Sequence, residues 1–280
     1  MVKQVKKTEK LELENKIFFD QISRLDHLSK EKDGTIFKVY SGLEELDNLI
    51  GGFRSKQLYV VSARAGVGKT SLLVSIFANL AQQKVPSFLF SLELGAEEIA
   101  CRFARNILMD EDFQFDQVEK FPTLIAYHKK KNKKLFECQK NIYFDANSYS
   151  IENLEKLIKE NSQKIRVYGV DFTGLIQIEI KGDTPDWKRL GMIVENLKRI
   201  ANENNVVLFL INHLNRATTN NNAMSEQGGS IDFERLATCI LQIYSIDSSP
   251  DKRVIKITKN RMGKLGECVL NFDGRFDLFY

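Results

Sequence analysis

Residues 63–71 read Ala-Arg-Ala-Gly-Val-Gly-Lys-Thr-Ser and stand between an apolar run and an amphipathic helical pattern. Gly66 and Gly68 lack a Cβ, so the main chain can approach phosphate oxygens closely. Lys69 would then reach the β- and γ-phosphates, and the hydroxyl of Thr70 would hold Mg²⁺. The pattern predicts a phosphate-binding loop; the alternative is a chance Gly-Lys-Thr in an ordinary loop. The residues expected to bind the nucleotide are Arg64, Ala65, Gly66, Val67, Gly68, Lys69, Thr70 and Ser71.

Two acids follow apolar runs that are typical of buried strands. Glu93 comes just after residues 87–91, and Asp171 ends the run at 166–171. Parallel α/β sheets bind their ligands at the carboxyl ends of their strands. We therefore expect Asp171 to hold Mg²⁺ and Glu93 to polarise the water that attacks the γ-phosphate. Alternatively, Glu93 would only stabilise the dipole of a helix that begins near residue 95.

Strands and helices alternate along most of the chain. Apolar runs predict strands at 58–62, 87–91, 142–144, 166–171, 206–212, 239–246, 253–258 and 267–271. Helical patterns fall at 69–83, 95–107, 151–162 and 186–204. Apolar strands separated by helices indicate a parallel sheet that is covered on both faces. The last strands are joined by shorter polar segments, which favour antiparallel hairpins at that end.

Composition excludes several classes of protein. The 280 residues carry 41 Lys and Arg against 37 Asp and Glu, a net charge of +4, and 43% are hydrophobic. The four cysteines are scattered, so a zinc ribbon is excluded and a reducing compartment is favoured. No apolar run approaches the ~20 residues of a membrane span. We expect a cytoplasmic protein without membrane contact, in which the lysine run at 129–134 is a solvated loop or helix end, with nucleic-acid contact as the alternative.

Residues 1–34 are predicted to form a charged leader helix that precedes one domain at 35–280. Leu13, Ile17, Phe18 and Leu25 belong to an apolar stripe along this helix. The stripe packs either on the chain's own domain or on a neighbouring subunit, and periodicity does not distinguish the two.

From about Tyr40 to Tyr280 the chain resembles the RecA-like ATPase domain of DnaB-type hexameric replicative helicases. The resemblance is carried in order by Ser41-Gly42-Leu43-Glu44-Glu45-Leu46-Asp47, Gly51-Gly52-Phe53, Ala63-Arg64 with the phosphate loop, Phe90-Ser91-Leu92-Glu93, Val170-Asp171, Asn212-His213-Leu214-Asn215-Arg216, Gly229-Ser230-Ile231 and Lys259-Asn260-Arg261-Met262-Gly263. Ala63 replaces the first glycine of the general loop pattern, but the family commonly has Ala-Arg-Pro there. The implied fold is a RecA-like P-loop NTPase, with a mostly parallel sheet and antiparallel hairpin strands at its C-terminal end.

The resemblance implies a motor that hydrolyses ATP with Mg²⁺ and moves along single-stranded DNA as a hexameric ring. Glu93 and Lys69 would act on the nucleotide of their own subunit. His213 stands where the family has a Gln that senses the γ-phosphate. Lys259 and Arg261 match a basic pair that completes the site of a neighbouring subunit; a solvated hairpin tip would explain the same two residues in a monomer.

The predicted DNA side departs from the family. Where the family's central loop presents an Arg, this sequence has Glu226, and a carboxylate repels the phosphates of a DNA strand. The backbone N–H groups of Gly228 and Gly229 remain candidates for DNA binding, together with Lys181 and Arg216. The sequence also has no counterpart of the family's N-terminal helical domain, and only the leader resembles its linker helix.

Two other functions fit the same motifs. One is a recombination ATPase of the wider RecA group, which would form filaments. The other is a shortened paralogue that binds ATP without unwinding DNA and interacts with a full-length helicase, a loader or other replication proteins.

Overall fold

Nine strands form one sheet in the computed structural model of the chain, which describes residues 37–147, 149–180, 184–213 and 230–280. The sheet order is β11-β10-β9-β8-β3-β7-β6-β4-β5. Its parallel strands are β3 (Gln57–Ala63), β4 (Ser87–Ser91), β5 (Ile142–Asp145), β6 (Val167–Asp171), β7 (Val207–His213) and β8 (Cys239–Ile246). The predicted parallel sheet is therefore confirmed, and the expected 87–91 and 239–246 match β4 and β8 at both ends.

The remaining strands extend this sheet in the antiparallel sense. β9 (Ser249–Asn260) pairs with β8, β10 (Gly266–Asp273) with β9, and β11 (Leu278–Phe279) with β10. The expected hairpins are confirmed, although β9 is twice as long as its apolar run and β11 was not predicted. Two further strands, β1 (Lys38–Val39) and β2 (Phe53–Arg54), form a separate antiparallel pair.

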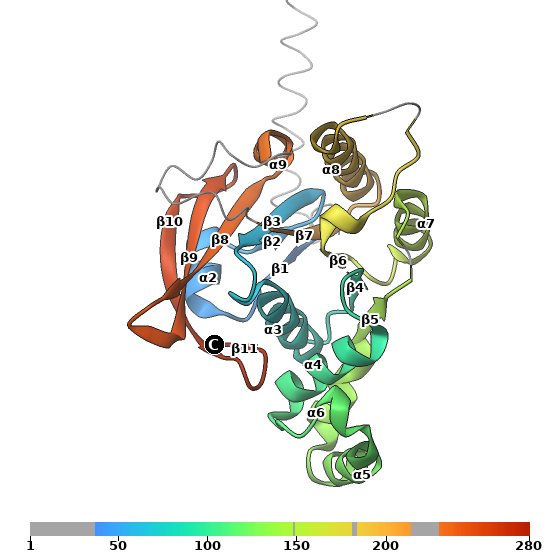
Figure 1. Ribbon diagram of the computed structural model, residues 1–280, viewed down its shortest axis with the longest axis vertical. Coiled ribbons are helices and arrows are strands. Elements are labelled where there is room, and N and C mark those ends of the chain that lie inside the picture. Colours follow the sequence, from blue (N-terminus) through green and yellow to red (C-terminus); the bar gives the residue numbers. More distant parts are fainter. Residues whose placement is uncertain (1–36, 148, 181–183, 214–229) are drawn as a thin grey trace, which may run out of the picture. The chain divides into compact units, whose positions relative to one another are not determined.

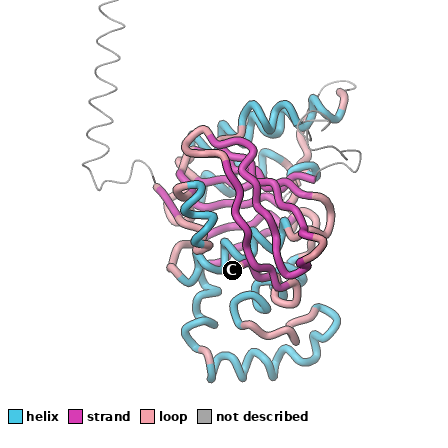
Figure 2. The backbone as a smooth tube through the Cα atoms, turned by 90° about the vertical axis from the view of Figure 1, so that its left-hand side faces the viewer, coloured by secondary structure: helices cyan, strands magenta, loops and turns pink. Residues whose placement is uncertain are grey.

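Helices cover both faces of the sheet, and the strands run between them (Figure 1, Figure 2). On one face α3 (Lys69–Gln82) packs so closely on β6 that a Cβ at Gly169 would lie 2.8 Å from Leu73. On the other face α7 (Ile151–Asn161) and α8 (Asp186–Glu203) pack on Tyr168 and Val170 of the same strand. The alternation along β6 therefore directs successive side chains to opposite faces.

Several helices were not predicted. They are α2 (Glu44–Ile50), α5 (Phe121–Lys131), α6 (Lys133–Cys138) and α9 (Ser230–Leu236), whereas α4 (Ala96–Leu108) was expected. Short 3-10 turns stand at Phe115–Lys120, Gln139–Asn141 and Thr173–Leu175. The lysine run at 129–134 spans the end of α5 and the start of α6, which agrees with a helix end. In Figure 1, α5 and α6 lie beside the β5 edge of the sheet.

Residues Lys38–Tyr280 form one compact unit. The expected leader helix at 1–34 lies outside the described residues. Cys101 and Cys239 are buried thiols. In the ranges that the structure covers, none of the helices combines the length and the apolar character that crossing a membrane requires.

Candidate functional site

The predicted phosphate loop joins the end of β3 to the start of α3. Gly66 and Gly68 adopt positive φ angles of 76° and 112°, which glycine accepts without steric cost. The first intrahelical bond of α3 runs from the N–H of Leu72 to the carbonyl of Gly68, over 2.9 Å. The N–H groups before Leu72 have no acceptor within the helix, so the loop and the positive end of α3 can bind phosphate oxygens.

Lys69 lies folded into this loop with only 6% of its surface exposed. Its Nζ donates to the carbonyl oxygens of Ala63 and Arg64, over 3.1 and 3.0 Å. Burial lowers the pKa of Lys69, while the nearby carboxylates of Asp171 and Glu93 raise it. The ammonium group is thus held at the mouth of the loop between two acids, where a phosphate group would also approach it.

Thr70 and Asp171 meet where α3 faces the end of β6. The Thr70 hydroxyl donates to Oδ2 of Asp171 over 2.6 Å, and Oδ1 of the same carboxylate is buried without a partner. Burial raises the pKa of Asp171 to about 6, with further effects from Thr70, which lowers it, and Glu93, which raises it. An unpartnered carboxylate oxygen beside a hydroxyl fits Mg²⁺, which prefers oxygen ligands. In the covered ranges no group of three His, Cys, Asp or Glu could hold a metal, so the other ligands would be phosphate and water oxygens.

Glu93 stands just beyond β4, beside Asp171. The N–H groups of Leu92 and Glu93 donate to the carbonyl of Asp171, which fixes the two strand ends side by side. The Glu93 side chain is 46% exposed, so a water molecule can reach it. Helix α4 begins only at Ala96, and its first turn has its own acids, Glu97 and Glu98. The role of a helix-end charge is therefore already filled by other residues.

His213 ends β7 and pairs in register with Ala63, the last residue of β3. Its Nε2 lies 3.6 Å from Oε2 of Glu93, which is close but too long for a hydrogen bond. The ring of Phe172 packs edge-on against the imidazole, with centroids 4.5 Å apart. Burial and the charge of Lys69 lower the pKa of His213, and Glu93 raises it. The net lowering favours the neutral imidazole at neutral pH.

Lys259 and Arg261 lie away from the cluster around Lys69 and Asp171. Lys259 pairs with Ile240 near the start of β8, and the N–H of Arg261 donates to the carbonyl of Thr238. β8 runs parallel to β3. The basic pair therefore lies toward the N-terminal ends of these strands, whereas the phosphate loop follows the carboxyl end of β3. Both side chains donate to backbone carbonyls at the end of α9, Lys259 to Glu234 and Arg261 to Arg235.

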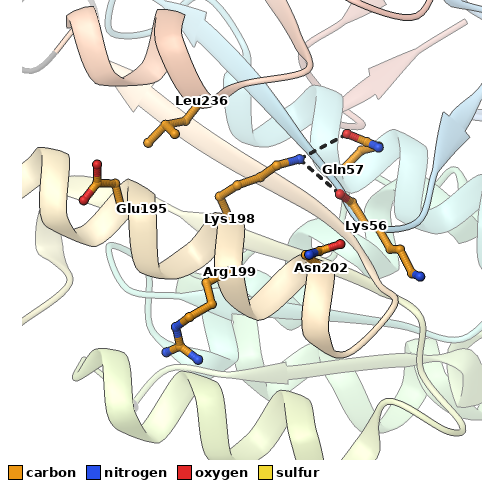
Figure 3. Close-up of a pocket in the computed structure, with 7 residues that line it drawn as sticks. All are labelled: Lys56, Gln57, Glu195, Lys198, Arg199, Asn202 and Leu236. Carbon is orange, nitrogen blue, oxygen red and sulfur yellow. Dashed lines mark hydrogen bonds between the residues drawn. The ribbon is translucent and has the colours of Figure 1, made fainter. Parts of the chain in front are cut away.

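A pocket of about 500 Å³ opens beside this basic pair (Figure 3). Lys198 crosses it from α8 and donates to the carbonyl of Lys56 and to Oε1 of Gln57, both over 3.1 Å. Burial lowers the pKa of Lys198 first, and the charges of Arg261 and Lys259 lower it further. The pocket therefore belongs to a cationic region near the N-terminal end of β3, whereas the phosphate loop follows the carboxyl end of the same strand.

Some expected site residues lie outside the described residues: Lys181, Arg216, Gly228 and Gly229, the four DNA-binding candidates, as well as Glu226. Other residues at the site were not predicted. Arg253 donates through Nε to the carbonyl of Val67 over 3.0 Å and stacks on the ring of Phe272. A Cβ at Gly68 would lie 3.3 Å from Phe279, so the segment after β10 forms the back of the loop. No local sequence pattern marks these residues.

Comparison with known proteins gives consistent results. The family described as DnaB-like helicase C terminal domain matches residues 38–280. The replicative DNA helicase DnaB of Haemophilus influenzae is 26% identical over 92% of this chain and 58% of its own length. That of Treponema pallidum is 24% identical over 86% of the chain and 55% of its own length. The chain therefore spans somewhat more than half the length of these relatives.

Two solved structures share the fold. One is an ATPase domain, which superposes with a TM-score of 0.76 at 21% identity, over 94% of this chain and 97% of that one. The other is a DnaB-like replicative helicase, studied with its primase interactions, which gives 0.72 at 21% identity, over 92% of this chain and 66% of that one. These matches confirm the expected RecA-like fold.

Proposed function

Because the chain belongs to the family of DnaB-like helicase C-terminal domains, we propose that it hydrolyses ATP with Mg²⁺ and serves as the motor of a replicative DNA helicase. One arrangement carries the proposal. Lys69, the pair of Thr70 and Asp171, and Glu93 meet at the carboxyl ends of three strands, β3, β6 and β4. Such an arrangement serves to bind a triphosphate and to activate water beside it.

Each residue has a role in this reaction. The N–H groups at the start of α3 bind the phosphates, and Lys69 leaves its carbonyl partners to neutralise the charge that develops on the γ-phosphate. Thr70 and Asp171 hold Mg²⁺, which supplies further charge neutralisation when it is bound. Glu93 orients a water molecule and takes its proton, and His213 donates a hydrogen bond toward the γ-phosphate.

Lys259 and Arg261 act on the nucleotide of a neighbouring subunit. Their position supports action on a neighbour. Both residues lie toward the N-terminal ends of the parallel strands, and neither belongs to the cluster around Lys69 at the carboxyl ends. Hydrolysis then depends on assembly. The leader at 1–34 is our candidate for the strap between subunits; deletion of these residues should abolish oligomers in light scattering, and intact oligomers would refute that role.

The test of the ATPase is direct. Calorimetry with Mg²⁺ and ATP should detect binding to the wild-type chain, and Lys69→Ala should remove it. Turnover is then measured with and without single-stranded DNA at several protein concentrations. The absence of both binding and turnover would exclude the motor.

A second candidate function is that of a shortened paralogue, which binds ATP and interacts with replication proteins without unwinding DNA. Glu226 favours it, because an acid at the expected DNA loop repels the strand. Strand displacement on a forked substrate distinguishes the two: ATP turnover without displacement favours the paralogue, and displacement excludes it.

A further inference from the structure

Asp277 lies in the turn between β10 and β11, with only 4% of its surface exposed and a φ of 48°. Its Oδ1 accepts from the hydroxyl of Ser71 over 2.9 Å and from Arg102 over 3.0 Å, and its Oδ2 accepts from Arg105 over 2.7 Å. Both carboxylate oxygens are therefore bonded by side chains that lie far away in the sequence, on α3 and α4.

The backbone around Asp277 is held as firmly as its side chain. Its carbonyl accepts from the hydroxyl of Ser75 over 3.0 Å and from the side-chain amide of Asn106 over 2.8 Å. The N–H of Phe279 donates to the same Ser75 hydroxyl, over 2.8 Å. Ser75 is on α3 and Asn106 on α4, so the turn is anchored on both helices even before the carboxylate is considered.

Asp277 joins α3, whose first turn contains the phosphate-binding residues, to α4, which begins just after the water-activating Glu93. Ser71 directly follows Lys69 and Thr70 in the first turn of α3. Arg102 and Arg105 lie on α4, the helix that begins three residues after Glu93. A movement of α3 relative to α4 would therefore change the distance from the bound phosphates to the water-activating carboxylate.

The burial of the Asp277 carboxylate makes its pairing energetically important. A buried carboxylate is tolerated only where it is paired, and removal of one partner leaves an uncompensated buried charge. Asp277 is opposed by two guanidinium groups, so its neutralisation would leave Arg102 and Arg105 facing each other across the same space.

We propose that Asp277 is a positioning residue for ATP hydrolysis, which holds the phosphate-binding turn of α3 at a fixed distance from the Glu93 end of α4. The inference rests on the proposed ATPase function and adds a residue to it. Asp277 touches neither the nucleotide nor the attacking water. Its loss should therefore lower kcat and leave the binding of ATP nearly unchanged.

The experiment compares Asp277→Asn with wild type in the full chain, with Mg²⁺, ATP and single-stranded DNA present. We expect kcat to fall by about 10- to 100-fold, the range for displacement of a catalytic group by a distant mutation. The Kd for ATP should stay within about threefold. Asp273→Asn is the matched control, because Asp273 is on the same hairpin and its ion pair with Arg275 is at the surface. The control should keep the wild-type kcat.

A second variant guards against misfolding of Asp277→Asn. Ser71→Ala removes only the hydroxyl that binds Oδ1 of Asp277 and leaves the ion pairs of Asp277 and the Ser75 contact to its carbonyl intact; it should lower kcat with little change in melting temperature. A restored kcat in Asp277→Glu would also support positioning by the carboxylate. Wild-type kcat in both Asp277→Asn and Ser71→Ala overturns the inference, as does a loss of ATP binding with kcat unchanged. No turnover by the wild-type chain overturns the proposed function itself, and this inference with it.

Discussion

The hydroxyl of Thr70 donates to Oδ2 of Asp171 over 2.6 Å, while Oδ1 of that carboxylate is buried and unpartnered. The same two side chains that would hold Mg²⁺ are thus bonded to each other. The contact satisfies one carboxylate oxygen, and the other remains available to a cation or its water shell.

This arrangement predicts that Asp171→Asn stabilises the chain when no nucleotide is present. Folding raises the pKa of Asp171 from 3.8 to about 6. The folded state therefore holds this proton more tightly than the unfolded state, so the free energy of unfolding decreases as pH rises from about 4 to about 6. At neutral pH the penalty is about 3 kcal/mol, and Asn removes it. Thermal denaturation at about pH 7.5 should show a higher melting temperature for the variant, with the gain vanishing near pH 4.

The same variant should lose its response to Mg²⁺. For wild type, we expect ATP to raise the melting temperature more when Mg²⁺ is added, because ligands that bind only the folded state stabilise it. In Asp171→Asn the increment from Mg²⁺ should disappear. An undiminished increment would show that Asp171 does not hold the metal.

Glu93→Gln should separate binding from hydrolysis. Gln keeps the size of the side chain but cannot accept the proton of the attacking water, so turnover should fall at least ~100-fold while ATP still binds. Glu97→Gln, a few residues away in the first turn of α4, is the matched control and should keep wild-type turnover. Equal losses in the two variants would contradict a specific role for Glu93.

At position 213, the family's Gln should preserve turnover, whereas an apolar residue should not. Gln retains a hydrogen-bond donor, so His213→Gln should keep turnover within about threefold, whereas His213→Leu should lose about 10- to 100-fold because it removes a donor near the developing charge. Turnover of both variants is compared at about pH 8, where the lowered pKa of His213 leaves the wild-type ring neutral. Full activity of His213→Leu would exclude a sensor role.

The sequence predicted those features whose residues are contiguous or nearly so in the chain. The phosphate loop and the acids at strand ends are contiguous motifs, and their strands are apolar runs that periodicity detects. Ser71 and Asp277 are 206 residues apart, and a contact between them has no local pattern. Arg253, which binds the carbonyl of Val67, was missed for the same reason. α5 was missed because its mixed composition, Phe-Pro to Lys-Lys-Lys, shows only a weak apolar stripe.

The separation of Lys259 and Arg261 from their own phosphate loop predicts that their action depends on a neighbour. Arg261→Ala alone should lower turnover at least ~100-fold, as for other residues that stabilise charge in trans. Lys69→Ala alone should be equally inactive. When the two inactive variants are mixed, an intact site on an Arg261→Ala subunit can receive Arg261 from an adjacent Lys69→Ala subunit.

In an equimolar mixture, random assembly gives about a quarter of the interfaces both an intact site and an intact Arg261, so about a quarter of wild-type turnover should return. Turnover should rise with protein concentration, because the active unit is an interface. Before it can act there, Arg261 must leave the carbonyl of Arg235 that it binds at the end of α9. If each subunit used its own Arg261, mixing would restore nothing, and the mixture would stay as inactive as its components at every concentration.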